Sequence, residues 1–331
     1  MNNAQKCRRV FSISDTVLET LRLVTNTHIN PLGIAHGGNV LRWMVTAATM
    51  TAMRVARGPA LLARLDNVFF INPIRLGMNA VITSWIEYIG HSSMELTILV
   101  EEEDPVAGAR KLTTAAHMTY VKVGRDLKPR PVEACIEPRG DVEEELYRRA
   151  LERKRNRGRR VPEERIEPVI SDFFIENYVL VNPEDTVAYG AMHAGRLLRI
   201  LDETAGILAM IYAKGVVVTA AVDATDFVAP ILQGDIARIR AAITYVGKTS
   251  VEVGLVVSTF NPVSSAERVN AQSFFTLVHL SSEGRPAPVP RPEVLSNEEI
   301  VQKAIERRRK RLELFKFFRQ EISKIKPPRR R

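Results

Sequence analysis

Long apolar segments and short polar turns follow one another in the same order twice along the chain. Residues 37–58, "GGNVLRWMVTAATMTAMRVARG", predict a long helix, and the closing Gly58 suits the left-handed residue that often ends a helix. At about 1.5 Å per residue this helix is roughly 30 Å long, enough to cross a whole sheet. Four segments typical of strands follow it: "ALLARLDNVFF", "NAVITSWIEYIG", "SMELTILVEE" and "LTTAAHMTYVKV". We therefore expect an α+β fold in which an antiparallel sheet wraps around a central helix.

The same pattern returns 157 residues later. "ISD" occurs in both copies, and a helical segment after each copy also repeats, as "EELYRRALERKR" and "EEIVQKAIERRR". Further matched pairs are Asp66/Asp223, Phe70/Phe227, Pro73/Pro230, Gly77/Gly234 and Gly90/Gly247. A constant offset over about 120 residues indicates a tandem duplication of the whole unit. We predict a first domain at 10–132, a charged helical linker at 133–166, a second domain at 167–289 and a basic helical tail at 290–331.

Composition changes this picture little. With 331 residues, 45% of them hydrophobic and 26% charged, the chain is long enough for two globular domains. No apolar run approaches the length of a membrane span, and the polar beginning does not resemble a signal peptide, so we expect a cytoplasmic protein. The two cysteines, Cys7 and Cys135, show neither a disulfide framework nor metal-ligand spacing. We expect two ordinary thiols in a reducing compartment.

The formal net charge of +9 belongs to the end of the chain. Residues 306–331 contain twelve Lys or Arg and three Asp or Glu, so the rest of the chain is neutral. Such runs are usually solvated, and no nucleic-acid-binding module accompanies this one, so we do not expect nucleic-acid binding. In the same segment Leu312, Phe315, Phe318 and Ile322 recur at three- to four-residue spacing, which favours packing on a partner subunit.

The loop before each long helix, and the helix itself, differ between the copies in a complementary way. "NPLGIAHGGNVLRWMV" begins at Asn30 and ends at Val45, whereas its counterpart "VAYGAMHAGRLLRILD" begins at Val187 and ends at Asp202. Two copies packed about a pseudo-two-fold axis form two equivalent grooves. If each groove takes a loop from one copy and a helix from the other, one groove holds both polar residues and the other holds both valines. The sequence therefore favours one complete site assembled from both copies.

Several segments together resemble the acyl-CoA thioesterases of the hotdog fold, above all the tandem double-hotdog acyl-CoA hydrolases. They are "HGG", "LLRILDE", the "VD…F…P…GD" pattern and "VGKTS". The resemblance covers nearly the whole chain apart from the first dozen residues, the linker and the tail. It implies two hotdog units paired as a pseudo-dimer, hydrolysis of acyl-CoA to free CoA and a fatty acid, and association of the chains, commonly as trimers. It also implies an active site formed by Asn30 and Asp202 from opposite halves.

The expected chemistry is thioester hydrolysis without a Ser or Cys triad, because no Gly-x-Ser-x-Gly elbow is present and neither cysteine has a histidine partner. We expect Asp202 to act as general base or nucleophile and Asn30 to orient the water or the carbonyl. Backbone N–H groups around Gly37 and Gly38 would polarise the carbonyl. We expect no metal and no cofactor, since coenzyme A is part of the substrate.

A turn in the second copy, "GKTS", resembles the turn with which the family contacts coenzyme A. It consists of Gly247, Lys248, Thr249 and Ser250. The lysine would offer a positive charge to a phosphate group. An ordinary β-turn with a solvated lysine explains the same residues, so both interpretations stay open.

Two other functions compete with hydrolysis. A hotdog hydratase or dehydratase places a histidine with an acidic residue, and "HINPL" from His28 is similar to a hydratase motif, but Val45 stands where the acid would be needed. An acyl-CoA-binding regulator could instead contact nucleic acid through the basic tail. His36 and His193 occur in both copies, so we expect them to pack or to fix the loop rather than to catalyse.

Overall fold

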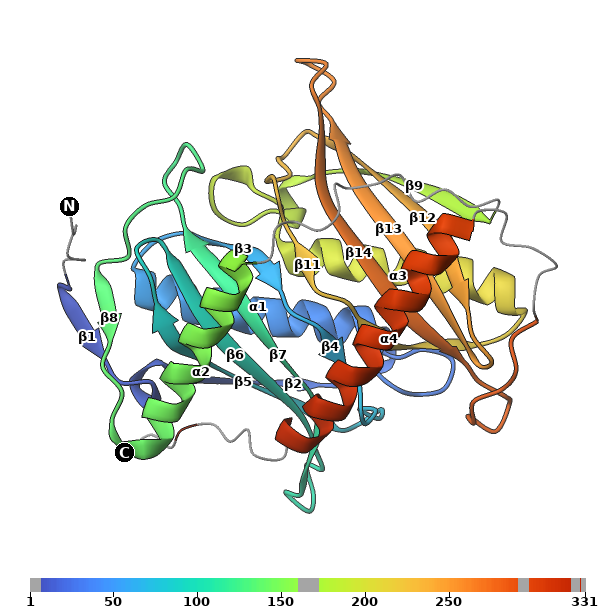
Figure 1. The fold of residues 1–331 in the computed structure, drawn as a ribbon, viewed down its shortest axis with the longest axis horizontal. Coiled ribbons are helices and arrows are strands. Elements are labelled where there is room, and N and C mark those ends of the chain that lie inside the picture. Colours follow the sequence, from blue (N-terminus) through green and yellow to red (C-terminus); the bar gives the residue numbers. More distant parts are fainter. Residues whose placement is uncertain (1–6, 160–172, 291–297, 323–327, 329–331) are drawn as a thin grey trace.

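The computed structural model describes residues 7–159, 173–290, 298–322 and 328, and the chain in it forms two units of the same architecture (Figure 1). In each unit a 20-residue helix lies against an antiparallel sheet, as the sequence pattern predicted. The first unit contains β2 (Leu18–Leu23), α1 (Gly37–Ala56), β3 (Ala60–Leu65), β4 (Val68–Phe69), β5 (Asn79–Ile89), β6 (Ser93–Glu103) and β7 (Arg110–Lys122). The second contains β9 (Phe174–Leu180), α3 (Ala194–Ala213), β10 (Val217–Val222), β11 (Thr225–Asp226), β12 (Ile236–Val246), β13 (Ser250–Phe260) and β14 (Glu267–His279).

The two units exchange short strands. The strand orders are β11-β3-β7-β6-β5-β2 and β4-β10-β14-β13-β12-β9, so each six-stranded sheet ends in a strand from the other unit. Phe69 of β4 lies opposite Ala221 of β10, and Thr225 of β11 lies opposite Leu65 of β3. The N-terminal halves of α1 and α3 also contact each other, and Figure 1 shows the two helices overlapping near the centre of the molecule. This exchange produces the pseudo-two-fold pairing and places the loop of one unit against the helix of the other.

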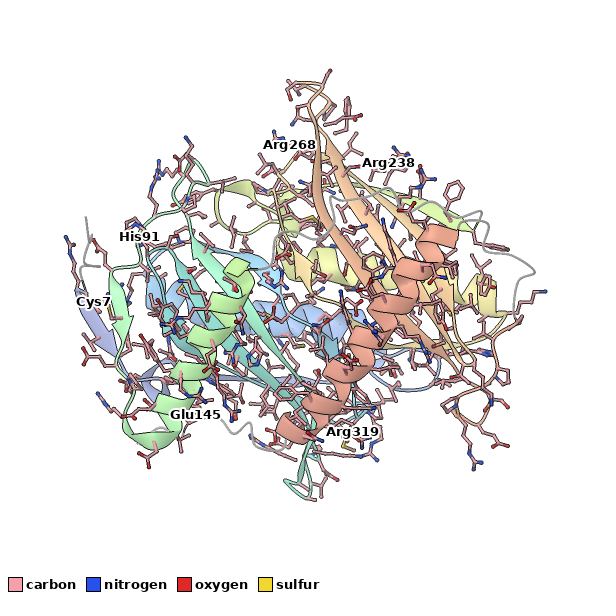
Figure 2. All side chains as sticks on the ribbon, viewed as in Figure 1. Cys7, His91, Glu145, Arg238, Arg268 and Arg319 are labelled. Carbon is pink, nitrogen blue, oxygen red and sulfur yellow. A yellow bond between two sulfur atoms is a disulfide. The ribbon has the colours of Figure 1, made fainter. Side chains whose placement is uncertain are left out.

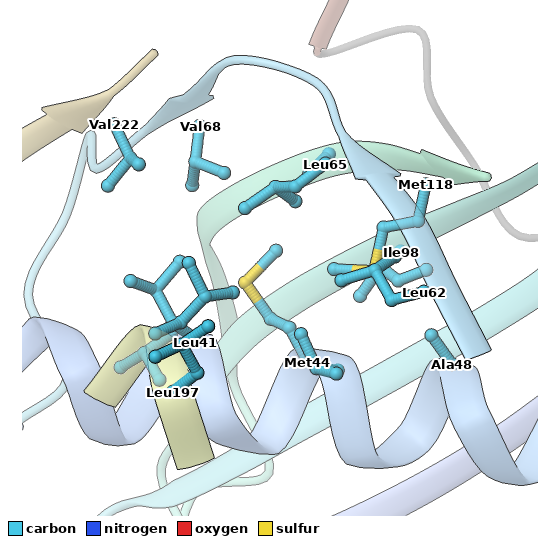
Figure 3. Packing of buried hydrophobic residues seen from close by; sticks show 14 of the residues in the cluster. Leu41, Met44, Ala48, Leu62, Leu65, Val68, Ile98, Met118, Leu197 and Val222 are labelled. Atoms are coloured by element: carbon cyan, nitrogen blue, oxygen red, sulfur yellow. The ribbon is translucent and has the colours of Figure 1, made fainter. Parts of the chain in front are cut away.

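The core between each helix and its sheet is apolar throughout. Figure 3 shows Leu41, Met44 and Ala48 of α1 packed against Ile98 and Met118 of the sheet. All five are buried, with at most 1% of any of them exposed. Spacings of three and four residues put these α1 side chains on one face of the helix, which explains why the sequence forms a long helix with one apolar side.

Two further helices cover the outer faces of the sheets, α2 (Gly140–Arg159) and α4 (Glu298–Glu321) (Figure 1). Arg153 of α2 donates to the buried carboxylate of Glu87 on β5. On α4, Arg311 donates to both carboxylate oxygens of Asp223, at 2.5 and 2.6 Å, and to Glu252 at 2.6 Å. A guanidinium fork suits such bidentate pairing, which fixes geometry as well as charge.

The apolar residues of α4 contact this chain itself, whereas the spacing of Leu312, Phe315, Phe318 and Ile322 suggested a partner subunit. The rings of Phe315 and Phe318 each lie 5.3 Å from the ring of Phe69 on β4. β4 belongs to the first unit but pairs with β10 in the second sheet, so α4 packs against the junction of the two units. Leu312 is exposed, Phe315 and Phe318 are half-buried, and Ile322 is buried.

The cysteines differ from the expectation of two ordinary thiols. Cys7 and Cys135 form a disulfide, with 5.6 Å between their Cα atoms. The bond lies beside the two-stranded parallel ladder of β1 (Arg9–Phe11) and β8 (Ala134–Ile136), at the outer edge of the first unit (Figure 2). The prediction was wrong because 128 residues separate the two cysteines, and only the fold shows that β1 and β8 pair.

Candidate active site

Two cavities lie where the units meet, and each combines a loop from one unit with a helix from the other. The larger, of about 550 Å³, is lined by Asn30 from the first unit and Asp202 from the second. The smaller, of about 260 Å³, is lined by Val187 from the second unit and Val45 from the first. The structure therefore brings Asn30 and Asp202 into one cavity across the two units. The other groove has the two valines in their places, and we call it the silent groove.

Asp202 is fully buried on α3 and accepts hydrogen bonds from three donors. The Gly38 N–H donates to Oδ2 at 2.5 Å, the Thr219 hydroxyl donates to Oδ1 at 2.5 Å, and Nδ1 of His36 lies 2.9 Å from Oδ2. Donors of this kind stabilise a negative charge that burial would otherwise make costly. An ionised carboxylate has about four acceptor positions, so one on Oδ1 is left for a water molecule or a substrate.

The sequence reasoning missed Thr219, which lies on β10 opposite the carboxylate. A bulge between Thr219 and Ala221 interrupts the pairing of β10 with β14 at this point. Bulges commonly occur next to active sites because they redirect a side chain. The residue 157 positions earlier is Leu62, which lines the silent groove, so the duplication that revealed Asp202 also contained the signal for Thr219.

Of the two glycines at the start of α1, Gly38 makes a different contact from the expected one, whereas the expected role of Gly37 stays a prediction. Gly38 donates its N–H to Asp202 and is therefore not free to polarise a carbonyl. A Cβ on Gly38 would lie 3.0 Å from the backbone of Arg199, and one on Gly37 would lie 2.9 Å from Cβ of Thr219. A side chain at either position would therefore be crowded, because α1 lies close to α3 and to Thr219 of β10. Gly37 also lines the cavity, and no acceptor for its N–H is seen within the described residues, so it remains a candidate donor to a substrate oxygen.

The paired histidines have opposite electrostatic environments. The hydrogen bond to Asp202 raises the pKa of His36, which favours the protonated ring as donor to the carboxylate. His193 faces no carboxylate, since Val45 replaces it, and burial lowers its pKa to about 4. A role for His36 in fixing the loop fits its position as N-cap of α1, and its contact with Asp202 adds a role in the site itself.

Asn30 makes a turn and faces the cavity at the same time. Its Oδ1 accepts hydrogen bonds from the N–H groups of Leu32 at 3.0 Å and Ile34 at 3.4 Å. This is the turn use of an Asn before a proline, and it fixes the side chain. The Nδ2 group has no acceptor among the described residues, so the amide can donate to a ligand in the cavity.

The turn 247–250 lies close to the cavity without lining it. Ser250 pairs with Val278, which does line the cavity, and the carbonyl of Lys248 accepts from the N–H of Val289. The side chain of Lys248 is exposed. This places the turn beside the cavity on the unit that carries Asp202, and a contact with coenzyme A remains a prediction.

The other candidate groups lie away from the cavity. His28 does not line it; its ring packs edge-on against Trp43, with 5.2 Å between centroids.

Among the described residues, no group of three or more His, Cys, Asp or Glu side chains is placed to hold a metal ion. Within those residues, no helix has both the length and the apolar character needed to span a membrane.

Comparisons with known proteins agree with this architecture. The model of the thioesterase superfamily matches the chain twice, at residues 32–109 and 189–266. Two proteins named cytosolic acyl coenzyme A thioester hydrolase, from human and mouse, are 33% and 31% identical to the chain over 82% and 81% of its length, and the matches cover 76% of each relative. A solved acyl-ACP thioesterase from Bacteroides thetaiotaomicron VPI-5482 superposes with a TM-score of 0.52 at 12% identity, covering 81% of this chain and all of that one, which shows a shared fold.

The chain belongs to the hotdog thioesterases, and within them to the acyl-CoA thioester hydrolases built from two tandem hotdog units.

Proposed function

We propose that the protein hydrolyses acyl-CoA thioesters to free coenzyme A and a fatty acid at one composite site per chain. The observation that carries this proposal is the pairing of Asn30 with Asp202 in the larger cavity and of Val187 with Val45 in the smaller. The similarity to acyl-CoA thioester hydrolases supplies the substrate class.

In the proposed mechanism Asp202 removes a proton from a water molecule as the water attacks the thioester carbon, or attacks that carbon itself to form an anhydride that water then hydrolyses. In both routes the C–S bond breaks, coenzyme A leaves as the thiolate, and the proton taken from water neutralises the thiolate. Thr219, Gly38 and His36 hold the carboxylate in place, so that only its free acceptor position meets the reacting atoms. The amide of Asn30 and the N–H of Gly37 donate to the carbonyl oxygen as it becomes negative. The reaction then needs no metal and no cofactor beyond the coenzyme A of its substrate.

Coenzyme A lies over the mouth of the cavity in this proposal. Val278 of the cavity wall lies on β14, which pairs with Ser250 of the turn 247–250, and Leu280 of the same wall follows the end of that strand. Lys248 would meet a phosphate of coenzyme A, and the N–H groups of the turn could add further donors. The binding role of Gly247, Lys248, Thr249 and Ser250 is tested by Lys248→Ala, which should raise KM at low salt and leave kcat nearly unchanged.

The experiment that tests the proposed function is a panel of acyl-CoAs from acetyl to palmitoyl, with thiol release as the readout. Hydration of crotonyl-CoA is measured in parallel, because His36 beside Asp202 is the combination that a hydratase would need. Release of free coenzyme A without hydration supports the hydrolase. Hydration without thiol release would overturn it.

We also propose that the chains associate as trimers. β2 and β9 end their sheets, and both carry exposed apolar residues at matched positions. The matched pairs on these strands are Leu21/Tyr178 and Leu23/Leu180, and on the helices the exposed Met50 of α1 matches the exposed Ile207 of α3. Two related patches on one chain allow a closed ring of chains, and the number three comes from the family resemblance. Light scattering should give three times the 37.1 kDa of one chain, and a mass of one chain would contradict the proposal.

The cytoplasm remains the proposed location, because the relatives are named as cytosolic proteins. The Cys7–Cys135 disulfide limits this proposal to a cytoplasm in which disulfides persist. Stable disulfides are rare in the cytosol of mesophiles but common in intracellular proteins of hyperthermophiles. Fractionation of the source cells, with alkylation of any thiols before lysis, tests the location and the disulfide together.

A further inference from the structure

The larger cavity continues along α3 beyond the catalytic groups. Asp202, Gly206 and Met210 follow one another at four-residue spacing and all three line the cavity. That spacing puts them in a row on one face of the helix. On β10, Val217 lies two residues before Thr219 and also lines the cavity. Beyond Asp202 the walls that α3 and Val217 supply carry no hydrogen-bonding side chain, so this part of the cavity suits an apolar ligand.

The silent groove shows what happens when this space is filled. Thr49 replaces Gly206 and Tyr120 replaces Leu277 at the matched positions. The hydroxyl of Tyr120 lies 3.0 Å from that of Thr49 and donates to the carbonyl of Val45 at 3.0 Å. Tyr120 is fully buried there. With these larger side chains the silent groove has about 260 Å³, against about 550 Å³ for the cavity that holds Asp202.

Gly206 itself has no packing reason to be a glycine. A Cβ built on it would meet no heavy atom within 4 Å outside its own helix. Glycine in the middle of a helix is less favourable than alanine, because its backbone loses more conformational freedom on folding. The helix thus includes an unfavourable residue at a point where the space beside it is open, and that space belongs to the cavity.

We propose that Gly206 forms the wall of an acyl-chain channel running from Asp202 to Met210, and that it sets the chain length of the substrate. The eight residue steps from Asp202 to Met210 advance about 12 Å along α3. An extended chain advances about 1.2 Å per bond, since the three backbone bonds of one residue cover at most about 3.6 Å. The channel therefore accepts a straight aliphatic chain of about ten carbons. This inference rests on the proposed hydrolase function.

The test compares kcat/KM across acyl-CoAs from butanoyl to palmitoyl. Each methylene buried in the channel should raise kcat/KM by about fourfold until the channel is full, near decanoyl. Gly206→Val blocks the channel, so kcat/KM for decanoyl-CoA should fall at least about a hundredfold while that for butanoyl-CoA stays within about threefold of the original. Gly206→Ala should show a smaller effect in the same direction, and it folds at least as well because alanine favours helices.

The matched control is Thr49→Val, which changes the equivalent position in the silent groove and should leave the chain-length profile unchanged. A Gly206→Val protein that loses activity equally on all chain lengths would overturn the inference, because the space would then hold the coenzyme A arm. An unchanged profile in both Gly206 variants would overturn it as well. If the unmodified protein releases no thiol from any acyl-CoA, the proposed function itself fails, and that result is distinct from the other two.

Discussion

Replacing Arg311 by alanine should destabilise the protein strongly, although the residue lies in a basic tail far from the site. Arg311 is only 8% exposed and holds both oxygens of Asp223 as well as one oxygen of Glu252. After the substitution Glu252 keeps Arg307, which donates to it at 2.7 Å, whereas Asp223 loses its guanidinium partner. Removing one member of a buried ion pair typically costs about 3–5 kcal/mol.

The expected shift in melting temperature follows from the size of the chain. The entropy of unfolding is about 2.1 cal/mol/K per residue, which for 331 residues is about 0.7 kcal/mol/K. A loss of about 3–5 kcal/mol therefore lowers Tm by about 4–7 °C. Burial raises the pKa of Asp223 even with Arg311 present, so the unpaired carboxyl can take up a proton in acid. The difference between the two proteins should accordingly shrink as the pH falls.

Equilibrium unfolding in urea at neutral and acidic pH measures this effect, together with Tm by circular dichroism. The matched control is Arg309→Ala, which removes an exposed arginine of the same helix and should change the free energy of unfolding by less than about 0.5 kcal/mol. If Arg311→Ala is no less stable than Arg309→Ala, the α4 contacts do not stabilise the fold and the reasoning is refuted.

Three other predictions follow from the same structure. Replacing Cys7 and Cys135 by serine opens a loop of 128 residues and should cost about 3–5 kcal/mol of unfolding free energy; a loss below about 1 kcal/mol in urea titrations would contradict this. His193 has a depressed pKa of about 4 in the folded state, so the stability it confers is present above pH 6.5 and is lost as the pH falls toward 4. Between pH 6.5 and 4 the unmodified protein should lose about 3 kcal/mol more unfolding free energy than His193→Gln, which cannot take up this proton. Parallel curves of unfolding free energy against pH for the two proteins would refute this prediction. Thr219→Val removes a hydrogen bond to a buried carboxylate and should lower turnover about 10- to 100-fold, whereas Thr219→Ser should retain most activity; near-full activity of the valine variant in a thiol-release assay would count against the site geometry.

The duplicated pattern predicted much of the fold because both copies repeat the same signals. A long helical segment followed by runs of strand-like residues predicted a sheet wrapped around a helix, and the observed units follow that order. The exchange of β4 and β11 between the sheets could not be predicted in the same way. Each is only two residues long, and so short a segment carries no periodic signal of its own.

The site was predictable where one copy has a residue type typical of catalysis, and unpredictable where it has a residue common in strands or no side chain at all. Valines stand at the positions of the other copy that match Asn30 and Asp202, and the structure brings Asn30 and Asp202 into one cavity. Thr219 against Leu62 is the same kind of difference, but threonine is too common in strands to suggest catalysis by itself. Gly206 carries no side chain, so its importance emerges only when the cavity beside it is seen.

The ends of the chain were hardest to interpret because their contacts are distant in sequence. A run of arginines usually indicates a solvated surface, yet Arg311 is buried against Asp223, 88 residues away. The disulfide of Cys7 joins residues that are further apart still. Charge and cysteine counts contain no information on such pairings, which depend on how the sheets are assembled.

The composite site is tested most directly by thiol release from four purified variants of similar stability, Asp202→Asn, Asn30→Ala, Val45→Ala and Val187→Ala. We expect Asp202→Asn to lose at least about a hundredfold in turnover while still binding acyl-CoA, and Asn30→Ala to be strongly impaired as well. The two valine variants line the silent groove and should keep turnover within about threefold of the unmodified protein, with some loss of stability at most. Near-full activity of Asp202→Asn, or inactive valine variants, would contradict a single site shared between the two units.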